Sequence, residues 1–551
     1  MATDKKLSWT VIAVVAGGLI ATTATSGAGN TKSGSPSRQR SVRDAGRKTV
    51  DTKSGQAFNV LAYAKNRACD DNSFQMAINA AAAVSPRGVV LIPAVSCTFK
   101  TANFDLSGLD GLQIVGSGIG ATVIHLAHPS NDLFRWTTTT YDQTIRDFSV
   151  TSDTVARTSG WIARVNVAYN GWALLCRVRF SDLDIKKQVN GLWIAQYEFV
   201  WITRCFMTDF VGKKAAITGA TNVGPIVITA PGHGYHSNDH VNITGVGGNA
   251  AANGTWVITV VDANTFQLNG SNGDGDYTGG GSVMRAGEGI GIKVGQTTRK
   301  DFEQEQGSEL YIQNVSIYGN DLAGSNPPLD IGLLIQNTDA VYVKNTSIGG
   351  CHSNCLKILA DSGAVAKNHF IANSVFDATQ ASHSAWLTGG GTIVDVMMTD
   401  NWYGSAGNNL PCGEVGQPAC VDALSGLRID VAGSGRIMII GGTIGNTRGT
   451  GLYVAPAGMM TISGMTITGN ANQDAVYIGC NGLGVLGPVL TGNYLVTTGT
   501  GYAMKTSNIS NRMSVNGNVL VGGSNGPTCY GYDGTTCGIG PPPAVNANNL
   551  N

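Results

Sequence analysis

The sequence predicts an all-β protein, a parallel β-solenoid that carries one helix near its N-terminal end and an inserted small antiparallel β-barrel. Three observations predict this fold: a bend residue that recurs in successive units, alternation of apolar and polar residues around each bend, and the composition. Of 551 residues, 75 are Gly, 36 are Lys or Arg and 36 are Asp or Glu. Abundant glycine with few charges favours many turns over helices with charged faces.

The repeat occupies residues 310–523. Eight segments of nine residues, from LYIQNVSIY to MSVNGNVLV, have an apolar residue at the third position and Asn, Asp or Gly at the fifth. These three residue types accept a left-handed backbone conformation at the least cost, so the fifth position is predicted to bend the chain in every unit. The predicted bend residues are Asn314, Asn345, Asn373, Asp400, Gly441, Gly464, Gly492 and Gly517.

Successive bends lie 23 to 41 residues apart, which is the spacing of repeat architectures. One unit cannot bury its inner face alone, so the units have to stack as coils. An antiparallel β-sandwich is the alternative, but it has no reason to repeat one bend at one place. We expect eight or more coils between about Gln56 and Gly523, with the amides of Asn314, Asn345 and Asn373 hydrogen-bonded along the axis.

The first 55 residues are predicted to lie outside the fold. A basic start precedes an apolar run over residues 7–24, which has the length of a signal peptide. Cleavage of this run and its retention as a membrane or particle anchor are both open, although the run is short and glycine-broken for a spanning helix. Residues 29–55 are polar and poor in apolar side chains, which is typical of a disordered linker.

The N-terminal cap carries a family resemblance. A helix is predicted near Asp71 to Val84, with Asp70 or Asp71 as its cap, and strands follow within Gly88 to Pro93 and from Leu112 onwards. These pieces resemble the N-terminal entry of pectate-lyase-like proteins. The resemblance implies a right-handed parallel β-helix in which the helix covers the open end of the solenoid.

The solenoid pattern stops after residue 212 and resumes after residue 285. Short alternating strands joined by Gly, Asn and Asp turns lie between, which predicts a small barrel inserted between two coils. This segment resembles the β-barrel module of phage tail proteins and ubiquitin-activating enzymes. The expected organisation is a signal or anchor with a linker (1–55), a first β-helix part with its cap (56–212), the inserted module (213–285), a second β-helix part (286–525) and a C-terminal tail (526–551).

The net charge of the chain and its family resemblance together limit the classes of function that fit the sequence. The formal net charge is zero and the pI is about 7.0, whereas nucleic-acid binders carry a basic surface. The resemblance implies a tailspike-like surface or virion protein that recognises cell-surface polysaccharide, with depolymerase activity as a further expectation. A secreted polysaccharide lyase or glycoside hydrolase and a non-enzymatic structural spike or adhesin are the alternatives. An extracellular location and a homotrimer are expected, and no cofactor is expected.

Candidate chemistry lies in the second half. The segment NTD that ends at Asp339 matches a motif of pectin-hydrolysing glycosidases, but Ser353 and Asn354 stand where those enzymes carry an aspartate pair. Glycoside hydrolysis needs two carboxylates, so Asp339 and Asp361 are the expected catalytic pair if the chain cuts its ligand. Aromatic and polar side chains that suit a sugar are densest after residue 330. The expected substrate-binding residues are Asp330, Trp386, Asp395, Trp402 and Tyr403.

Eleven cysteines in a chain with an export-like start indicate an oxidising compartment. Two pairs of cysteines bracket short loops, and a disulfide is predicted across each loop. Cys351 and Cys355 either pair or stay as small apolar residues inside a turn. No metal site is predicted, because no second ligand pair stands at a metal spacing. The predicted disulfides join Cys412 to Cys420 and Cys529 to Cys537.

Overall fold

The computed structural model describes residues 51–52, 55–85, 87–153, 157–165, 175–296, 307–319, 327–407, 424–455, 459–469, 473–479, 488–497, 499–507, 514–524 and 528–531. This part of the chain consists almost entirely of β-strands, as predicted. Its one α-helix is α1 (Asp71–Ala82), and its three 3-10 helices are η1 (Val60–Ala62), η2 (Lys65–Arg67) and η3 (Ala250–Ala252).

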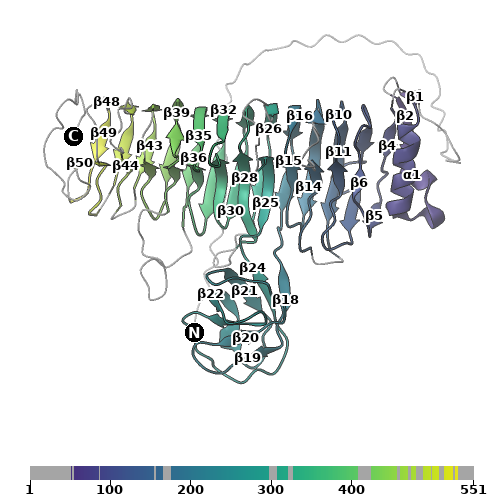
Figure 1. The fold of residues 1–551 in the computed structure, drawn as a ribbon, viewed down its shortest axis with the longest axis horizontal. Helices are drawn as coiled ribbons and strands as arrows, with labels where there is room; N and C mark the ends of the chain where they lie inside the picture. Colours follow the sequence, from purple (N-terminus) through teal and green to yellow (C-terminus); the bar gives the residue numbers. More distant parts are fainter. Residues whose placement is uncertain are drawn as a thin grey trace, which may run out of the picture. The chain divides into compact units, whose positions relative to one another are not determined.

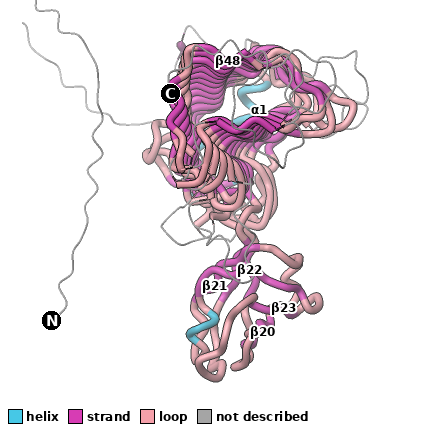
Figure 2. The backbone as a smooth tube through the Cα atoms, turned by 90° about the vertical axis from the view of Figure 1, so that its left-hand side faces the viewer, coloured by secondary structure: helices cyan, strands magenta, loops and turns pink. Residues whose placement is uncertain are grey.

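The strands form a right-handed parallel β-helix with three parallel ladders, and each coil passes through ladder 1, ladder 2 and ladder 3 in turn (Figure 1, Figure 2). Ladder 1 comprises β2 (Gly55–Asn59), β4 (Val89–Leu91), β7 (Gln113–Val115), β11 (Thr144–Thr151), β14 (Arg179–Lys186), β16 (Tyr197–Thr203), β26 (Gly307–Gln313), β29 (Val341–Lys344), β32 (Val365–Ala372), β35 (Thr392–Thr399), β39 (Ile437–Ile440), β42 (Met460–Ser463), β45 (Val489–Thr491) and β48 (Ser514–Asn516).

Ladder 2 continues each coil after a bend, and the second halves of β11 and β14 belong to it. Its other strands are β3 (Cys69–Asp70), β5 (Ser96–Phe99), β8 (Val123–Leu126), β17 (Phe206–Thr208), β27 (Ser316–Tyr318), β30 (Ser347–Cys351), β33 (Val375–Thr379), β36 (Trp402–Gly404), β40 (Thr443–Gly445), β43 (Thr466–Thr468), β46 (Tyr494–Val496) and β49 (Val519–Val521). Short strands beside ladder 1 are β1 (Asp51–Thr52), β10 (Thr140–Tyr141), β13 (Leu175–Cys176) and β38 (Gly433–Ser434).

Ladder 3 is a continuous sheet of 13 strands. Its strands are β6 (Phe104–Asp105), β9 (Phe134–Trp136), β12 (Ala163–Val165), β15 (Leu192–Ile194), β25 (Gly289–Gly295), β28 (Leu329–Gln336), β31 (Asn354–Leu359), β34 (Ala385–Thr388), β37 (Leu427–Ile429), β41 (Leu452–Val454), β44 (Val476–Gly479), β47 (Met504–Ser507) and β50 (Thr528–Gly531). The prediction of eight or more coils is therefore confirmed.

The bend between ladders 1 and 2 lies where the repeat predicts it. All eight predicted bend residues are left-handed, with φ between 49° and 65°. The register extends the column upstream to Asp147, Asp182 and Arg204, which have φ of 66°, 53° and 52°. The same backbone bend is therefore used on successive coils, and non-glycine residues accept it where the next coil supports it.

The amide ladder lies mainly one residue after the bend, which corrects part of the prediction. The predicted column shows one such bond, from Asn345 Nδ2 to Asn314 Oδ1 at 3.4 Å, on the exposed side. The residue after the bend points inward instead: Asn493 Nδ2 donates to Asn518 Oδ1 at 2.8 Å, and Asn401 Oδ1 accepts from the Ser374 N–H at 3.0 Å. Inside the coil no water competes for these amides, so they bond to one another and to the backbone.

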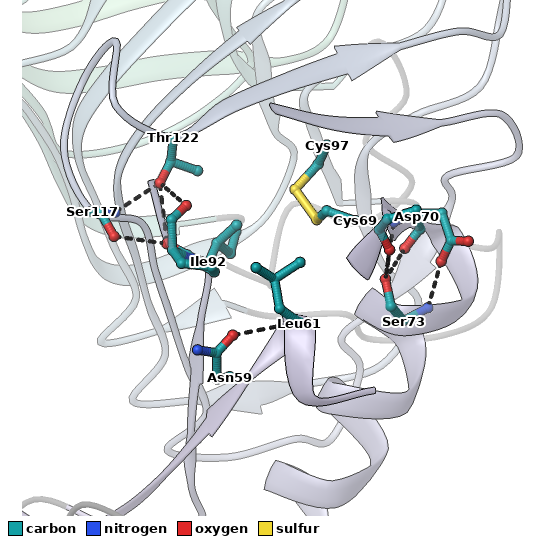
Figure 3. The surroundings of a disulfide bond; sticks show 11 residues. Asn59, Leu61, Cys69, Asp70, Ser73, Ile92, Cys97, Ser117 and Thr122 are labelled. Carbon is teal, nitrogen blue, oxygen red and sulfur yellow. Dashed lines mark hydrogen bonds between the residues drawn. A yellow bond between two sulfur atoms is a disulfide. The ribbon is translucent and has the colours of Figure 1, made fainter. Parts of the chain in front are cut away.

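Helix α1 packs over the first coils. Asp70 caps it, because Asp70 Oδ1 accepts from the Ser73 N–H at 2.8 Å and Ser73 Oγ accepts from the Asp70 N–H at 2.9 Å (Figure 3). Phe74 lies in the core with its ring 5.1 Å from that of Phe99 and 4.7 Å from that of Phe104. The helix thus covers the apolar interior at this end, as the resemblance implies.

A separate antiparallel sheet interrupts the coil between β17 and β25. Its strands are β18 (Lys214–Ala216), β19 (Gly219–Ala220), β20 (Val227–Thr229), β21 (His240–Thr244), β22 (Gly254–Val260), β23 (Thr265–Leu268) and β24 (Ser282–Arg285). The edge strands β18 and β19 are two pieces of one segment, and the N–H groups between them, of Ile217 and Thr218, donate to Gly281 at 3.0 Å and Thr229 at 2.8 Å. The seven strands thus form one antiparallel sheet with its own apolar core around Phe266.

Candidate functional site

The outward side chains of ladder 3 form one column along the β-helix. The strand register places one residue per coil in this column, and cations alternate with aromatic rings over most of its length. We call it the rung column. Its members are Arg135, Arg164, Trp193, Lys293, Leu334, Lys357, Trp386, Arg428, Tyr453, Tyr477 and Lys505.

The centre of the rung column is a nearly symmetrical run of five rungs. Lys293 Nζ lies 4.6 Å from the ring centre of Trp193, and Lys357 Nζ lies 4.5 Å from that of Trp386, with Leu334 between the two lysines. Burial lowers the pKa of both lysines, although nearby carboxylates act in the opposite direction. Cation–π contact fixes each ammonium group but replaces only part of its hydration.

The outer cations of the rung column have carboxylate partners. Arg428 Nε lies 2.7 Å from Oδ2 of Asp430, the residue directly after β37, and Arg164 lies 3.8 Å from Asp132. Asp430 also accepts from Trp386 Nε1 at 2.7 Å, and these bonds hold the pKa of its carboxyl below its ordinary value despite burial. Within the described ranges neither Lys293 nor Lys357 forms an ion pair within 4.0 Å, so the two central cations are the ones that lack a close anion.

The two predicted catalytic carboxylates lie at the edge where ladder 3 turns into ladder 1. Asp339 forms an ion pair with Lys367 at 3.2 Å and accepts from Asn368 Nδ2 at 2.8 Å. Asp361, on the next coil, accepts from Asn337 Nδ2 at 2.6 Å and from Gln336. Each carboxylate therefore has its own donors, and their catalytic role stays a prediction.

A second polar cluster lies at the opposite edge, where ladder 2 turns into ladder 3. Ser353 Oγ donates to Asp330 Oδ1, and His352 Nδ1 lies 3.1 Å from Gln380 Oε1. Gly287, with a φ of 68°, borders both side chains: a Cβ there would lie 2.5 Å from His352 Cδ2 and 3.2 Å from Asp330 Oδ1. Asp330 and His352 thus surround one point, and both are partly exposed.

The predicted substrate-binding residues do not share one face. Asp330 and Trp386 lie on ladder 3. Trp386 is a member of the rung column, and Asp330 lies beside that column. Asp395 lies on ladder 1, where it pairs with Arg436 at 2.6 Å, and Trp402 lies on ladder 2. Tyr403 is 1% exposed and stacks on Phe376 inside the core. Only the first two therefore lie on the same ladder, on coils two apart and in different registers.

The cysteine predictions fare differently from one another. Cys412, Cys420 and Cys537, and the side chain of Cys529, lie outside the described residues. Cys351 and Cys355 are buried free thiols with their sulfur atoms 2.9 Å apart.

One disulfide was missed by the sequence analysis. Cys69 and Cys97 form it between β3 and β5, which are paired strands of neighbouring coils (Figure 3). The two residues are 28 positions apart in the sequence, so only coil stacking makes them neighbours.

The rung column was also missed, although a sequence signal exists. Each strand of ladder 3 in this region has an apolar residue on both sides of its outward residue, as in LWI, IKV, LKI, AWL, LRI, LYV and VYI. Alignment of these second repeats on their middle residue lines up the lysines, arginines and aromatic residues. The bend repeat, by contrast, covers only the strands of ladders 1 and 2.

Two further properties of the described residues bear on the site. No three His, Cys, Asp or Glu side chains in these ranges are grouped so as to hold a metal ion. No helix in them is long and apolar enough to cross a membrane, and residues 7–24 lie outside them.

Comparison with known proteins gives relatives in structure alone. No protein-family model and no curated protein sequence matches the chain. The A-module of the mannuronan C-5 epimerase AlgE6 from Azotobacter vinelandii is 14% identical over 86% of this chain and 97% of its own, with a TM-score of 0.46.

Two further structures are more distant. The Dettilon tailspike protein is 10% identical over 86% of this chain and 68% of its own, with a TM-score of 0.36. The GH87 α-1,3-glucanase from Streptomyces thermodiastaticus is 12% identical over 88% of this chain and 69% of its own, with a TM-score of 0.38. By its three parallel ladders, this chain is a right-handed parallel β-helix protein.

Proposed function

We propose that the chain is a tailspike-like surface or virion protein that binds an anionic polysaccharide along the rung column. The observation that carries this proposal is the pair Lys293 and Lys357, two partly buried ammonium groups that lie against tryptophan rings and form no ion pair within 4.0 Å in the described part of the chain. A ligand carboxylate or sulfate would supply the missing partner. The gain is large where the cation is already desolvated.

The geometry of the column suits a polymer. Successive rungs of a parallel ladder are about 4.8 Å apart, which is close to the length of one pyranose residue in an extended glycan. A chain of acidic sugars aligned with the axis therefore meets a new rung at each residue. The outer cations extend the same surface, since Arg164 and Arg428 continue the column on both sides of the central lysines.

The tryptophans act mainly as supports for the cations. Arg164 and Lys293 lie at 4.9 Å and 4.6 Å from the ring centre of Trp193, and the register places them on the two neighbouring rungs. The ring faces that point along the axis are thus used by the cations. Recognition in this proposal depends first on charge and second on the exposed ring edges.

Location and assembly are part of the same proposal. An extracellular site, on a cell surface or a virion tail or after secretion, fits a protein that meets polysaccharide, and residues 7–24 would be its export signal or its anchor. We also propose a homotrimer. The apolar outer side chains of ladder 1, among them Trp201, Tyr342 and Met397, support a contact between copies. Light scattering of the intact chain at a monomer mass would reject this assembly.

The experiment that tests the binding proposal is a panel of immobilised or soluble polysaccharides. Polygalacturonate, alginate and hyaluronan serve as anionic ligands, and dextran serves as the neutral control. We expect binding to at least one anionic polymer, weakened by added salt because exposed charges are screened. Equal binding to dextran, or binding that salt does not weaken, would contradict the proposal.

The alternatives differ in turnover. A secreted polysaccharide lyase or glycoside hydrolase would cut the bound polymer, whereas a structural spike or adhesin would only hold it.

A further inference from the structure

Charge alternates along the middle of the rung column. Over successive rungs of this run, a cation lies on every second rung and an uncharged side chain lies between each two cations. Two rungs of a parallel ladder span about 10 Å, so this is the spacing of neighbouring cations along the column. The members of the run, in order, are Arg164, Trp193, Lys293, Leu334, Lys357, Trp386 and Arg428.

Packing of cations on rings does not explain the whole alternation. Trp193 contacts the cations on both neighbouring rungs, and Trp386 contacts Lys357. Leu334 has no ring, yet a lysine lies on the rung before it and on the rung after it. Its side chain is 6% exposed, so it offers a ligand neither a charge nor a hydrogen-bonding group. The alternation therefore continues at a rung where cation–π contact gives no reason for it.

A carboxylate borders this uncharged rung. Asp361 accepts a hydrogen bond from Gln336 Nε2 at 3.0 Å. Gln336 follows Leu334 by two residues on β28, so the two side chains lie on the same side of the strand. Burial lowers the pKa of Lys293 and of Lys357, and the charge of Asp361 acts in the opposite direction on both. Asp361 is thus close enough to act on both lysines, beside the rung that separates them.

The next uncharged rung, that of Trp386, has the same arrangement. Asp430 accepts from Trp386 Nε1 at 2.7 Å and from Arg428 Nε at 2.7 Å. Burial acts to raise the pKa of Asp430, but these hydrogen bonds hold it below its ordinary value, so the carboxylate keeps its charge. A ligand anion over the rung of Trp386 would therefore lie beside a negative charge of the protein.

We propose that the rung column selects anionic glycans by the spacing of their charges, and prefers chains with one anionic group for every two sugar residues to chains with one on every residue. This inference rests on the proposed binding function, in which one sugar residue lies over each rung. Anionic groups on alternate sugars pair with Lys293 and Lys357, and the uncharged sugar between them lies over Leu334. Leu334 is the residue that determines this specificity.

A chain with an anionic group on every sugar places additional anions over the uncharged rungs. There they lie beside Asp361 and Asp430, and like charges repel one another. Charge density alone favours the opposite order, because a more highly charged glycan is attracted more strongly to the same cations at a given ionic strength. Preference for the less charged chain therefore separates charge spacing from simple attraction.

The test compares two probes that share one backbone. Chondroitin carries one carboxylate for every two sugars, and chondroitin 6-sulfate carries in addition a sulfate on the intervening sugar. Isothermal titration calorimetry with the intact chain measures both affinities at equal chain length and ionic strength. We expect chondroitin to bind at least threefold more tightly. Equal or tighter binding of chondroitin 6-sulfate would overturn the proposal.

A lysine at the central rung should reverse the preference. Leu334→Lys produces three consecutive cations and is expected to raise the affinity for chondroitin 6-sulfate at least tenfold, and that for chondroitin less than threefold. The aliphatic part of the lysine can replace the leucine while its ammonium group reaches the surface. Leu334→Gln is the uncharged control and should keep the wild-type order. A folded Leu334→Lys that keeps this order would overturn the role of Leu334, and the wild-type comparison decides the proposal if the variant does not fold.

The outcomes separate the two proposals. Binding of polygalacturonate, which carries a carboxylate on every sugar, without binding of chondroitin overturns the selection by charge spacing and leaves the binding proposal standing. Absence of binding to every anionic polymer overturns both.

Discussion

Ladders 1 and 3 carry two outward columns that share one geometry and differ in chemistry. In ladder 1 one cation, Arg179, lies over Trp201, and from there on the rings contact each other: Tyr311 stacks on Trp201 at 6.0 Å and on Tyr342 at 5.0 Å. In ladder 3 the tryptophans contact cations, as Trp193 and Trp386 do with the two central lysines. The residues that continue the ladder 1 column after Tyr342 are Phe370, Met397 and Met438.

The comparison shows that the residue type at one position per coil determines the chemistry of a whole face of a β-helix, because the coils stack in register. Like residues on successive rungs satisfy one another, so a ladder of rings is stable but leaves no charge for a ligand. Alternation of rings and cations leaves cations that are held in place but not neutralised. This difference is why we assign glycan binding to ladder 3 and subunit contact to ladder 1.

The largest expected effect comes from removal of the two central lysines. Lys293→Gln/Lys357→Gln is expected to weaken binding of the anionic polymer by at least about 100-fold, because each charge-assisted contact is worth roughly 1.5 to 3 kcal/mol. Isothermal titration calorimetry measures the affinity. Arg179→Gln, which removes the cation that lies 4.5 Å from Trp201 on ladder 1, is the control and should bind normally. Equal losses in both variants would erase the distinction between the two faces.

Raising the pH gives the second largest effect. Burial lowers the pKa of both lysines, so in the free protein they lose their charge at a lower pH than exposed lysines do. Above that pKa, affinity should fall by up to about tenfold per pH unit for each lysine that must bind a proton. Lys293→Arg/Lys357→Arg should resist this fall, since a guanidinium group stays charged. The same loss of affinity with rising pH in the wild type and in the arginine variant would contradict the role of these ammonium groups.

A matched pair of tyrosine variants gives a smaller effect. Tyr453 and Tyr477 stack at 4.9 Å on ladder 3, as Tyr311 and Tyr342 do on ladder 1. Tyr477→Ala and Tyr342→Ala should each lower the free energy of unfolding. The lost ring stacking contributes roughly 1 kcal/mol to this, in addition to the contribution of the apolar area that the ring buries. Only Tyr477→Ala should also weaken glycan binding, by several-fold. Chemical denaturation and titration on the same samples measure both quantities, and weaker binding by Tyr342→Ala would mean that ladder 1 also contacts the glycan.

The smallest effect on glycan binding is expected at the bend between ladders 1 and 2. Asn345 has a φ of 50° on the exposed side of the coil. Asn345→Ala should lower the free energy of unfolding by about 1 to 2 kcal/mol, the cost of a left-handed alanine. Asn345→Gly should restore it, since glycine adopts this conformation freely. Glycan affinity should be unchanged in both, and a large change would show that the bend positions the rung column directly.

The repeat, the capping helix and the insertion were predictable because their signals are local in the chain. A segment of nine residues is enough to recognise a left-handed residue after a short apolar strand, as in the segment that contains Asn314. Asp70 and Ser73 form their capping box within one helical turn. The inserted antiparallel strands were predictable because strand alternation continued while the bend repeat stopped.

The rung column and the polar cluster of Asp330 and His352 were decided by tertiary structure. Trp193 and Lys293 are 100 positions apart because the inserted segment lies between their strands, and they become neighbours only when β15 pairs with β25. Asp330 and His352 meet because one coil places its turn over the next. Coils differ in length, so the sequence by itself determines that strands stack but not which side chains share a rung. That choice follows from the hydrogen-bond register of the ladders, which forms only when the coils are packed.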